Sequence, residues 1–492
     1  MNFRPRLSLL RNRDVERIIT GAYELLAGTG VKIKNKEALQ LLADHGASVN
    51  FSTQVAAMPL DLVEKCLKTV PSSLEFYNYS GDQTVRLEGD TVHFVLDSAP
   101  IYLLDSESKK IRTAKTKDMV DIIKLVDNLE HVACITACVV PDDVPINLCD
   151  VIRFHQTLIY SHKPVFGGAF SIDGLLAEIE LLTVLAGDKD TMRKRPRVFM
   201  AANPSAPLMW SPTSAGNLID CAKNNIPLMI IPIPLSGGTT PVTLAGTMVE
   251  HTAECLSGIV LSQCTRKGAP IIYGGGATAL DMQEGINAEG AIETKMMAVA
   301  NNAQIGKYFN LPTAANCGRN DAEMFDAQAA TESGFGMLLG ALAGINMIRG
   351  VGMLDHGGAV SMEKMVFDNE VCGIIQRLIE GITVTEETLA VDFIKDNKFN
   401  AAGILGSDLT FDWFKKELFV PSPEIIGRTS YTKYAAGGCK EIFERAREKK
   451  DQILNAYQAP HIDRHTRDEM KQVLIKYAEK KGEEIPGFIL ND

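Results

Sequence analysis

The most constraining feature of this sequence is a regular alternation of helix-like segments and short apolar runs between about residues 117 and 351. The apolar runs are rich in valine, isoleucine and alanine, a pattern typical of strands that are buried on both faces of a parallel sheet. These runs lie at residues 132–140, 164–170, 197–202, 227–233, 270–276, 312–317 and 345–351. The segment 91–98 has the same character and precedes the first helix, so it completes a set of eight strands.

Eight strands that alternate with helices predict an α/β protein with a (β/α)8 TIM barrel. A doubly wound open sheet would produce the same local alternation. We favour the barrel because eight units are many for an open sheet and because no glycine-rich phosphate motif follows the first strand. In a barrel, the loops after the strands share one end, and this is where an active site is expected.

Two extensions flank the predicted barrel, which we place at residues 91–380. Residues 1–90 predict a layer of helices and a small antiparallel β element, because helical spacing gives way to turn signals at Ser80-Gly81-Asp82 and Glu88-Gly89-Asp90. Residues 381–492 predict a C-terminal helical extension with helices at 385–397, 408–418, 440–456 and 463–480. This extension is also a candidate surface for a homo-oligomer.

Composition excludes several classes of protein. The net charge of −11 argues against a nucleic-acid surface, and no apolar run has the eighteen or so residues that a membrane span needs. The N-terminus lacks the apolar core of a signal peptide. Ten cysteines without a CxxC pair indicate reduced thiols. We therefore expect a cytoplasmic enzyme that binds neither nucleic acid nor membrane.

Polar residues follow the last two predicted strands and should meet at the barrel mouth. Asn316 and Arg319 come after the first of these strands, and His356 comes after the second. Arg319 could bind a substrate carboxylate in a bidentate manner, unless Asp321 or Glu323 pairs with it. His356 could donate a hydrogen bond to the same group, although a purely structural role stays open.

Glycines and aromatic residues also gather near the predicted strand ends. The glycines form either an open rim or tight turns between strands and helices: Gly237, Gly238, Gly274, Gly275 and Gly276. The aromatic side chains could form a cage for a cation or belong to the core: Tyr102, Phe166, Phe170, Trp210 and Tyr273. Asn203 adds an amide at the end of its strand.

Two other kinds of site find little support. Glu250, His251 and Glu254 share one predicted helix, but no cysteine or second histidine has matching spacing, so we expect no metal site. The sequence has no GxSxG motif, and no Ser-His-Asp arrangement can be argued.

A set of motifs in residues 311–370 resembles the trimethylamine:corrinoid methyltransferase family. The motifs are Asp326-Ala327-Gln328-Ala329, Glu332, the run LAGINMI at 342–348, Ser361-Met362-Glu363 and the run VFDNE at 366–370. The resemblance implies a TIM barrel that transfers a methyl group from an amine to the cobalt of a separate corrinoid protein, with no tightly bound cofactor of its own. Looser similarity extends over most of the chain.

One departure from the family pattern bears on the substrate. The trimethylamine enzymes carry pyrrolysine in the active site, whereas this sequence contains only the twenty common residues. The resemblance is therefore to the non-pyrrolysine branch, whose members demethylate quaternary amines. A quaternary nitrogen leaves as a neutral tertiary amine without a general acid, so positioning and electrostatics suffice for the chemistry.

The function expected from this resemblance is methyl transfer from a small quaternary amine to Co(I) of a corrinoid protein. Glycine betaine is the first candidate substrate, followed by proline betaine or a carnitine-like compound. The expected substrate-binding residues are Arg319, His356, Asn316, Asn203, Tyr102, Phe170 and Tyr273, and the five glycines are expected to face the corrinoid. Two alternatives are a barrel lyase or aldolase acting on a phosphorylated substrate and a non-catalytic binding protein.

Overall fold

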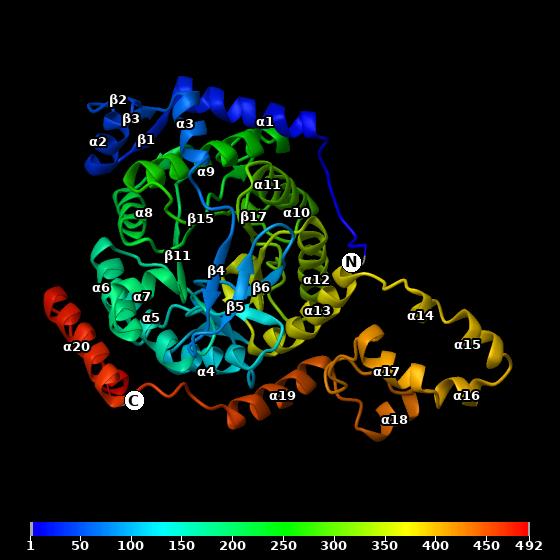
Figure 1. Cartoon of the computed structure of the whole chain (residues 1–492). Helices are drawn as coiled ribbons and strands as arrows, with labels where there is room; N and C mark the ends of the chain where they lie inside the picture. The colour runs from blue at the N-terminus through cyan, green and yellow to red at the C-terminus, as the bar shows by residue number, and fades with distance from the viewer. Residues whose placement is uncertain (1–2, 491–492) are drawn as a thin grey trace.

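Among residues 3–490, which the computed structural model describes, eight short parallel strands surround the centre of the molecule (Figure 1). The strands are β6 (His93–Leu96), β9 (Val132–Cys134), β10 (Val165–Phe166), β11 (Val198–Ala202), β13 (Leu228–Ile230), β15 (Ile271–Tyr273), β18 (Ala314–Ala315) and β19 (Met347–Val351). Helices alternate with them: α4 (Thr116–Asp127), α5 (Cys149–Tyr160), α6 (Ile172–Ala186), α7 (Lys189–Lys194), α8 (Pro212–Asn224), α9 (Leu244–Thr265), α10 (Ile292–Ala298), α11 (Gly306–Tyr308), α12 (Ala327–Ala343) and α13 (Met362–Glu380).

The strands pair in chain order, and every pair is parallel. Ladders join β6 to β9, β10 to β11, β11 to β13, β13 to β15 and β18 to β19. Single bridges join the remaining neighbours, Ile135 to Val165 and Tyr273 to Thr313. Strand β19 then pairs with β6, with Met347 opposite His93, so the order of pairing returns to the first strand. The α/β class predicted from the sequence is confirmed.

Apolar side chains from alternate strand positions fill the space between the strands. They form one cluster: Val95, Cys134, Phe166, Phe199, Met229, Ile231, Ile272, Ala314 and Met347. The hairpin of β4 (Leu74–Tyr77) and β5 (Gln83–Leu87) lies across one end of the strands in Figure 1, and the ring centroid of Phe76 is 5.2 Å from that of Phe199. Because the hairpin covers this end, the loops that follow the strands form the open end.

The N-terminal elements pack outside the strands. They are α1 (Asn12–Glu24), β1 (Val31–Ile33), α2 (Lys36–Asp44), β2 (Ser48–Asn50), β3 (Val55–Ala57) and α3 (Leu60–Leu67). Helices α1 and α3 contact α9, and β1 pairs with the short strand β12 (Met209–Trp210).

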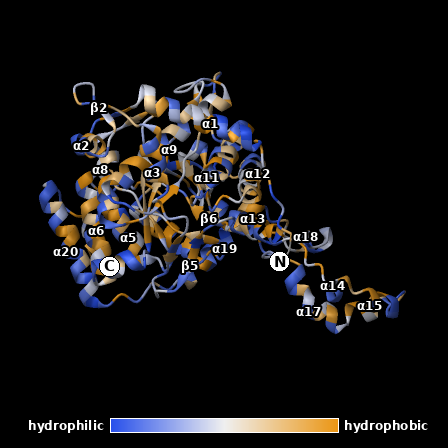
Figure 2. Ribbon diagram, turned by 45° about the horizontal axis from the view of Figure 1, so that its top comes forward, coloured by the Kyte–Doolittle hydropathy of each residue, from blue (hydrophilic) through white to orange (hydrophobic). Residues whose placement is uncertain are grey.

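The C-terminal region has two parts. Helix α19 (Ile442–Ala456) packs against α13, and α20 (Arg464–Lys481) packs against α6. Between α13 and α19 the chain projects away from the strands (Figures 1 and 2) as α14 (Glu386–Leu389), α15 (Val391–Asp396), α16 (Ala401–Leu405), α17 (Asp408–Glu417) and α18 (Tyr431–Ala436). None of the described side chains of these five helices is buried.

The structure differs from the sequence prediction at several turns and loops. The turn at Glu88-Gly89-Asp90 forms no hairpin, because β6 pairs with β9 and β19 rather than with β5. Short strands that the periodicity did not predict lie in the loops: β14 (Leu235–Ser236), β16 (Thr278–Asp281), β17 (Ile286–Ala288), β20 (Met353–Leu354) and β21 (Ala359–Val360). Strands β7 (Tyr102–Leu104) and β8 (Ile111–Thr113) form an antiparallel pair. Within residues 3–490, no helix is long and apolar enough to cross a membrane.

Candidate active site

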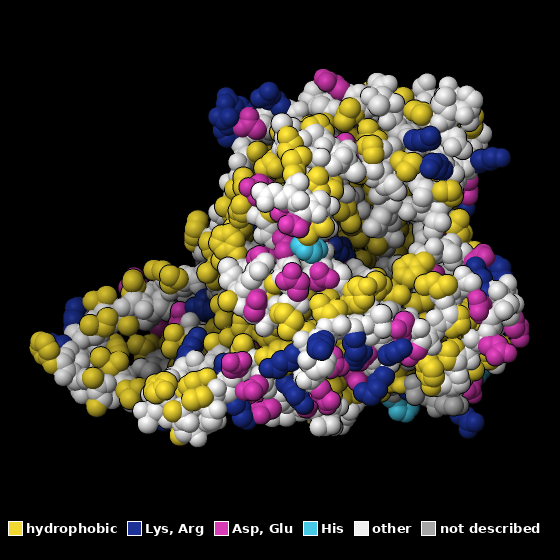
Figure 3. Space-filling model, turned by 180° about the vertical axis from the view of Figure 1, so that it is seen from behind, with side chains coloured by type: hydrophobic (Ala, Val, Ile, Leu, Met, Phe, Trp, Pro, Cys, Tyr) yellow, Lys and Arg dark blue, Asp and Glu magenta, His cyan; other side chains and the backbone are white. Residues whose placement is uncertain are grey.

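The loops that follow the strands surround a hollow in the face shown in Figure 3. A cavity of about 330 Å³ lies here, and we call it the mouth cavity. Two arginines line it, Arg153 from α5 and Arg349 from β19. Other lining residues follow β6, β10, β11 and β13 or lie on α8: Ser98, Gly167, Gly168, Phe170, Asn203, Asn217 and Ile231.

Arg349, on β19, is buried. Its Nη2 donates a hydrogen bond to Asp97, and its guanidinium carbon lies 4.7 Å from the ring centroid of Phe166. Its Nε is buried and has no hydrogen-bond partner. Burial lowers the pKa of Arg349, and Asp97 opposes that shift. A carboxylate bound in the mouth cavity would therefore meet a cation that is only partly compensated.

Neutral acceptors hold the side chain of Arg153. Its Nε donates to the carbonyl of Val139 at 2.9 Å, and its Nη2 donates to the carbonyl of Ala137 and to Oγ of Ser98. Its guanidinium carbon lies 5.2 Å from the ring centroid of Phe170. Among the described residues, no carboxylate lies within 4.0 Å of this guanidinium. These hydrogen bonds fix the orientation of the Arg153 guanidinium group, but no anionic side chain pairs with it among the described residues.

Two acidic residues, Asp150 and Glu178, line a smaller cavity that Arg153 also lines. Both carboxyl oxygens of Glu178 are buried without a hydrogen-bond partner. Burial raises the pKa of Glu178 well above its ordinary value, and nearby Asp150 adds to the shift. Asp150 itself accepts a hydrogen bond from the backbone N–H of Phe170 at 3.0 Å, which holds the loop that carries this ring. The raised pKa favours a neutral Glu178, which leaves Arg153 available to an external anion.

Arg319 belongs to a buried ion network that it shares with Arg349 through Asp97. Its Nε donates to Asp97 at 2.6 Å, and its Nη1 donates to Glu289 at 3.0 Å. Burial alone would raise the pKa of Asp97, but Arg319 and Arg349 outweigh it and lower that pKa to about 2. Lys295 donates to the backbone carbonyl of Arg319 at 2.7 Å. The partners of Arg319 are therefore distant in sequence, and neither Asp321 nor Glu323 pairs with it.

The other predicted binding residues are spread over the open end. Asn203 and Phe170 line the mouth cavity, and Phe170 is 48% exposed. Nδ1 of His356 lies 2.8 Å from the carboxylate of Asp321. Asn316 is buried, and neither polar atom of its amide has a hydrogen-bond partner.

The two predicted tyrosines lie apart from this cavity. Tyr102 is partly exposed on β7. Tyr273 is fully buried on the helix-facing side of β15, where its hydroxyl donates to Oγ1 of Thr252 at 3.4 Å. The structure therefore brings Asn203 and Phe170 together with Arg153 and Arg349, but it does not bring Tyr273 to them.

The predicted glycine rim divides into two groups. Gly237 and Gly238 lie at the surface in the loop after β14, where Gly237 has φ of 88°. Gly274, Gly275 and Gly276 are buried after β15. A Cβ on Gly275 would lie 2.6 Å from the carbonyl oxygen of Pro232. The buried group therefore permits close packing of the backbone inside the protein.

Arg153 and Arg349 are the residues that sequence reasoning missed. One signal was present for Arg349, because it is a charged residue within an otherwise apolar strand, and a charge that is buried in this way needs a partner. Arg153 gave no comparable signal, because its helix also contains other polar residues, and only the structure shows that the first eleven residues of this helix are all buried.

The acidic helix segment that we judged not to bind a metal lies in α9. His251 is buried, and neither of its ring nitrogens has a hydrogen-bond partner. Burial lowers the pKa of His251 to about 3 and raises that of Glu254 to about 8. Within the described part of the chain, no group of three or more His, Cys, Asp or Glu side chains is arranged to hold a metal ion.

Comparison with known proteins agrees with the family motifs. The family model described as trimethylamine methyltransferase (MTTB) matches residues 1–486. The trimethylamine methyltransferase MttB of Desulfitobacterium hafniense (strain DSM 10664 / DCB-2) is 31% identical over 91% of this chain and 89% of its own length. The glycine betaine methyltransferase of D. hafniense (strain Y51) is 26% identical over 98% and 99%.

The chain is also similar to solved structures of methylamine methyltransferases. The Methanosarcina barkeri monomethylamine methyltransferase (MtmB) has a TM-score of 0.48 at 13% identity, over 90% of this chain and 94% of that chain. The match of the family model to almost the whole sequence, together with the identity to MttB, shows that this chain belongs to the trimethylamine methyltransferase (MTTB) family.

Proposed function

We propose that this methyltransferase moves a methyl group from a small carboxylated quaternary amine to Co(I) of a partner corrinoid protein. Glycine betaine is the first candidate substrate, and proline betaine or a carnitine-like compound comes next. The observation that carries the proposal is the pair of arginines in the mouth cavity, Arg153 and Arg349. The name of one relative, a glycine betaine methyltransferase, points to the same substrate class.

The cyclic order of strand pairing supports the (β/α)8 barrel as the architecture behind this function. In such barrels the active site lies where the strands end, and its residues come from several different loops. The mouth cavity meets this description, because its lining comes from loops after β6, β10, β11 and β13.

A betaine carboxylate loses hydration when it enters the cavity, so cationic or N–H donors must meet it. We assign this role to Arg153 and Arg349, with Asn203 as a further donor. Arg319 is less suited than the sequence suggested, because Asp97 and Glu289 already compensate its charge. His356 has an acidic neighbour of its own in Asp321. We therefore place these two residues in support of the site rather than in contact with the carboxylate.

With the carboxylate held inside, the trimethylammonium end points toward the opening. Phe170 lines the cavity and is partly exposed, so its ring offers an aromatic surface that could stabilise this cation. The Co(I) nucleophile attacks one methyl carbon while the carbon–nitrogen bond breaks, and the electron pair of that bond stays on nitrogen. The products are methyl-Co(III) on the partner and a neutral tertiary amine, so no proton donor is needed.

A corrinoid protein must approach the opening closely for this transfer. Exposed apolar side chains surround the opening (Figure 3), as expected for a docking surface. They come from the loops and helix starts at this end: Ile101, Ile146, Phe170, Ile172, Ile233, Val242, Met282, Ile286, Ile292 and Met324. Gly237 and Gly238 lie in the same loop region as Val242, which keeps them as candidates for corrinoid contact.

The proposal can be tested by mixing the protein with glycine betaine and cob(I)alamin under reducing conditions. We expect the absorption spectrum of methylcobalamin to appear together with stoichiometric dimethylglycine. Trimethylamine serves as the comparison substrate because the relatives in the family carry its name. Failure with a panel of betaines, alongside transfer from trimethylamine, would refute the substrate class but not the reaction.

A further inference from the structure

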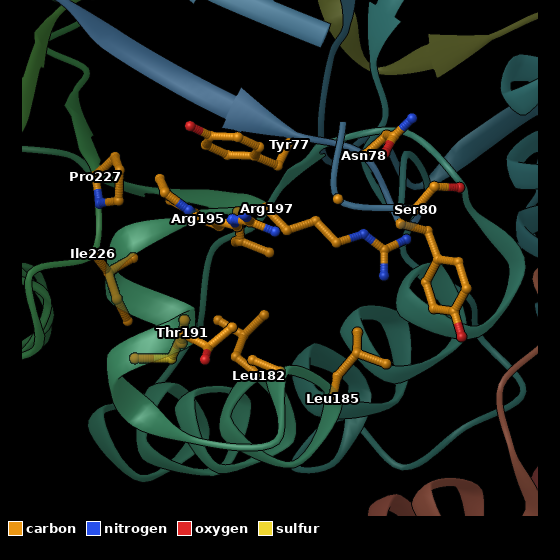
Figure 4. A pocket seen from close by; sticks show the side chains of 16 residues that line it. Tyr77, Asn78, Ser80, Leu182, Leu185, Thr191, Arg195, Arg197, Ile226 and Pro227 are labelled. Atoms are coloured by element: carbon orange, nitrogen blue, oxygen red, sulfur yellow. The ribbon is translucent and has the colours of Figure 1, made fainter. Parts of the chain in front are cut away.

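A second cavity, of about 240 Å³, lies near the opposite ends of the strands (Figure 4). Its lining comes from the turn of the β4–β5 hairpin, from α6 and α7, and from residues that precede β11 and β13. We call it the amino-end cavity, because Arg197 directly precedes β11 whereas Asn203 of the mouth cavity directly follows it. The two cavities are therefore separated by the length of this strand.

The walls of the amino-end cavity are apolar and aromatic. Tyr77 lies on one side in Figure 4, opposite Leu182 and Thr191. Tyr79 also lines the cavity. The apolar lining consists of Leu182, Leu185, Ala186, Met192, Val198 and Ile226. The described lining contains no Asp or Glu, but it contains Arg195 and Arg197. In a chain with net charge −11, this cavity is locally basic.

Arg197 has more donors than partners. Its Nη2 donates to the carbonyl of Ser161, and its guanidinium carbon lies 5.1 Å from the ring centroid of Tyr79. Its Nε and Nη1 are buried without a hydrogen-bond partner. Burial lowers the pKa of Arg197 to about 10, which leaves the side chain charged at neutral pH. A buried donor without a partner is costly, and a native structure usually supplies an acceptor.

The nearest acid does not supply that acceptor. Asp127 accepts hydrogen bonds from Oγ of Ser161 and from both the backbone and Nδ1 of His162. Among the described residues, no carboxylate lies within 4.0 Å of Arg197. Arg195 is exposed, and its guanidinium forms no hydrogen bond or ion pair within the described part of the chain. Both guanidinium groups are thus available to an anion that enters the cavity.

We propose that the amino-end cavity binds a small organic monocarboxylate with an aromatic or branched aliphatic body. The carboxylate pairs with Arg197 and Arg195, and the body lies between Tyr79 and the apolar side chains of α6. The volume is slightly below the range of about 300–1,000 Å³ that is usual for small-molecule sites, so it suits a ligand of the size of benzoate. A predominantly apolar pocket with a few convergent polar groups is the usual composition of such sites.

The hairpin turn is also tied to the C-terminal segment. The hydroxyl of Tyr79 donates to the backbone carbonyl of His461 at 2.7 Å. His461 lies in the connection between α19 and α20. A ligand against Tyr79 therefore contacts a point at which the strands, the hairpin and the C-terminal helices meet, and its binding should raise the thermal stability of the whole chain.

Isothermal titration calorimetry of the full chain with benzoate at pH 7 tests the proposal. We expect saturable binding to the wild-type protein. The affinity should fall at least tenfold in Arg197→Met. It should fall as much in Ala186→Leu, a substitution that fills the cavity and keeps both arginines. Binding should be unchanged in Arg153→Met, which changes the mouth cavity, and in Arg464→Met, which changes an exposed arginine. Benzamide, the neutral analogue, should bind at least tenfold more weakly than benzoate.

Three results would overturn the proposal. The first is the absence of a saturable heat of binding with benzoate, phenylacetate and isovalerate. The second is benzoate binding that Arg153→Met abolishes and Ala186→Leu leaves intact, which would assign the ligand to the mouth cavity. The third is inorganic phosphate binding as tightly as benzoate, since an apolar body would then contribute nothing. If Arg197→Met does not fold, Arg195→Met replaces it, because that side chain is exposed and should not be needed for folding.

Discussion

The carboxylate of Asp97, at the end of β6, accepts a hydrogen bond from Nε of Arg319 at 2.6 Å although the two residues are 222 positions apart. The other carboxylate oxygen of Asp97 accepts from Arg349. One buried acid thus joins the first and the last strand of the pairing order to the loop after β18. This link holds Arg349 in the wall of the mouth cavity.

Replacing Asp97 with Asn should strongly destabilise the protein. Arg319 would then keep Glu289 as its acid, whereas Arg349 would lose the one carboxylate with which it pairs among the described residues. Removing one partner of a buried ion pair costs about 3–5 kcal/mol. Urea denaturation at pH 7 measures the loss. Asp14→Asn is the control, because it removes an exposed pair with Arg11 and should change the free energy of unfolding by less than about 1 kcal/mol. Equal effects of the two substitutions would contradict this account of the network.

The ion pairs of Asp97 with Arg319 and Arg349 also predict that the protein loses stability in acid. The pKa of Asp97 is lowered from 3.8 to about 2 in the folded protein. Its stabilising contribution is therefore complete above the unfolded value of 3.8 and is lost as the pH falls toward 2. The difference in unfolding free energy between the wild type and Asp97→Asn should shrink across this window. A difference that stays constant from pH 5 to pH 2 would show that Asp97 does not titrate as described.

Glu254 predicts a pH dependence of the opposite sign. Burial raises its pKa from 4.5 to about 8, so folding favours the protonated form and stability falls as the pH rises from about 4.5 to 8. At about 1.4 kcal/mol per pKa unit, the effect is a few kcal/mol. Glu254→Gln should therefore raise the denaturation midpoint at pH 8 and leave it nearly unchanged at pH 5. The exposed Glu16→Gln is the control, and a similar gain in both variants would contradict the assignment.

The sequence predicted the strand and helix pattern well because that pattern is local. Buried runs such as 345–351 and helices such as α8 depend on apolar periodicity and on capping, for example the Ser211 side chain that accepts from the N–H of Ser214. The predicted strands were often too long, as in 132–140, where only Val132–Cys134 is a strand. The apolar run is longer than the strand because the buried loop that follows it is also apolar, as at Ile135, Cys138 and Val139.

The candidate site was predicted less well because its contacts are not local. The sequence offered Asp321 and Glu323 as neighbours of Arg319, whereas the actual partners are Asp97 and Glu289. Periodicity places these residues at strand ends but gives no information about which side chains meet across the opening. Likewise, the run Gly274–Gly276 looked like an open rim, and only the packing against Pro232 shows that it is buried.

That packing predicts a stability effect at Gly275. An alanine here would adopt φ of 113° and place its Cβ 2.6 Å from the carbonyl oxygen of Pro232. Overpacking of this kind costs about 1–3 kcal/mol in addition to the backbone strain. Gly285→Ala is the matched control, because φ is also positive there but no atom lies within 4 Å. Denaturation midpoints that fall equally in both variants would contradict the close contact.

Substrate discrimination tests the two arginines of the mouth cavity. Arg153→Met should raise the apparent KM for glycine betaine about tenfold or more, as expected from the loss of a charge-assisted hydrogen bond worth about 1.5–3 kcal/mol. The KM for a quaternary amine without a carboxylate, such as choline, should change much less, because that substrate leaves the arginine unused. Arg464→Met is the control: this exposed arginine of α20 does not line the mouth cavity, so the KM for either substrate should not change. If Arg153→Met raised the KM equally for both substrates, Arg153 would instead have a structural role. Its hydrogen bonds to the backbone carbonyls of Val139 and Ala137 would explain that role.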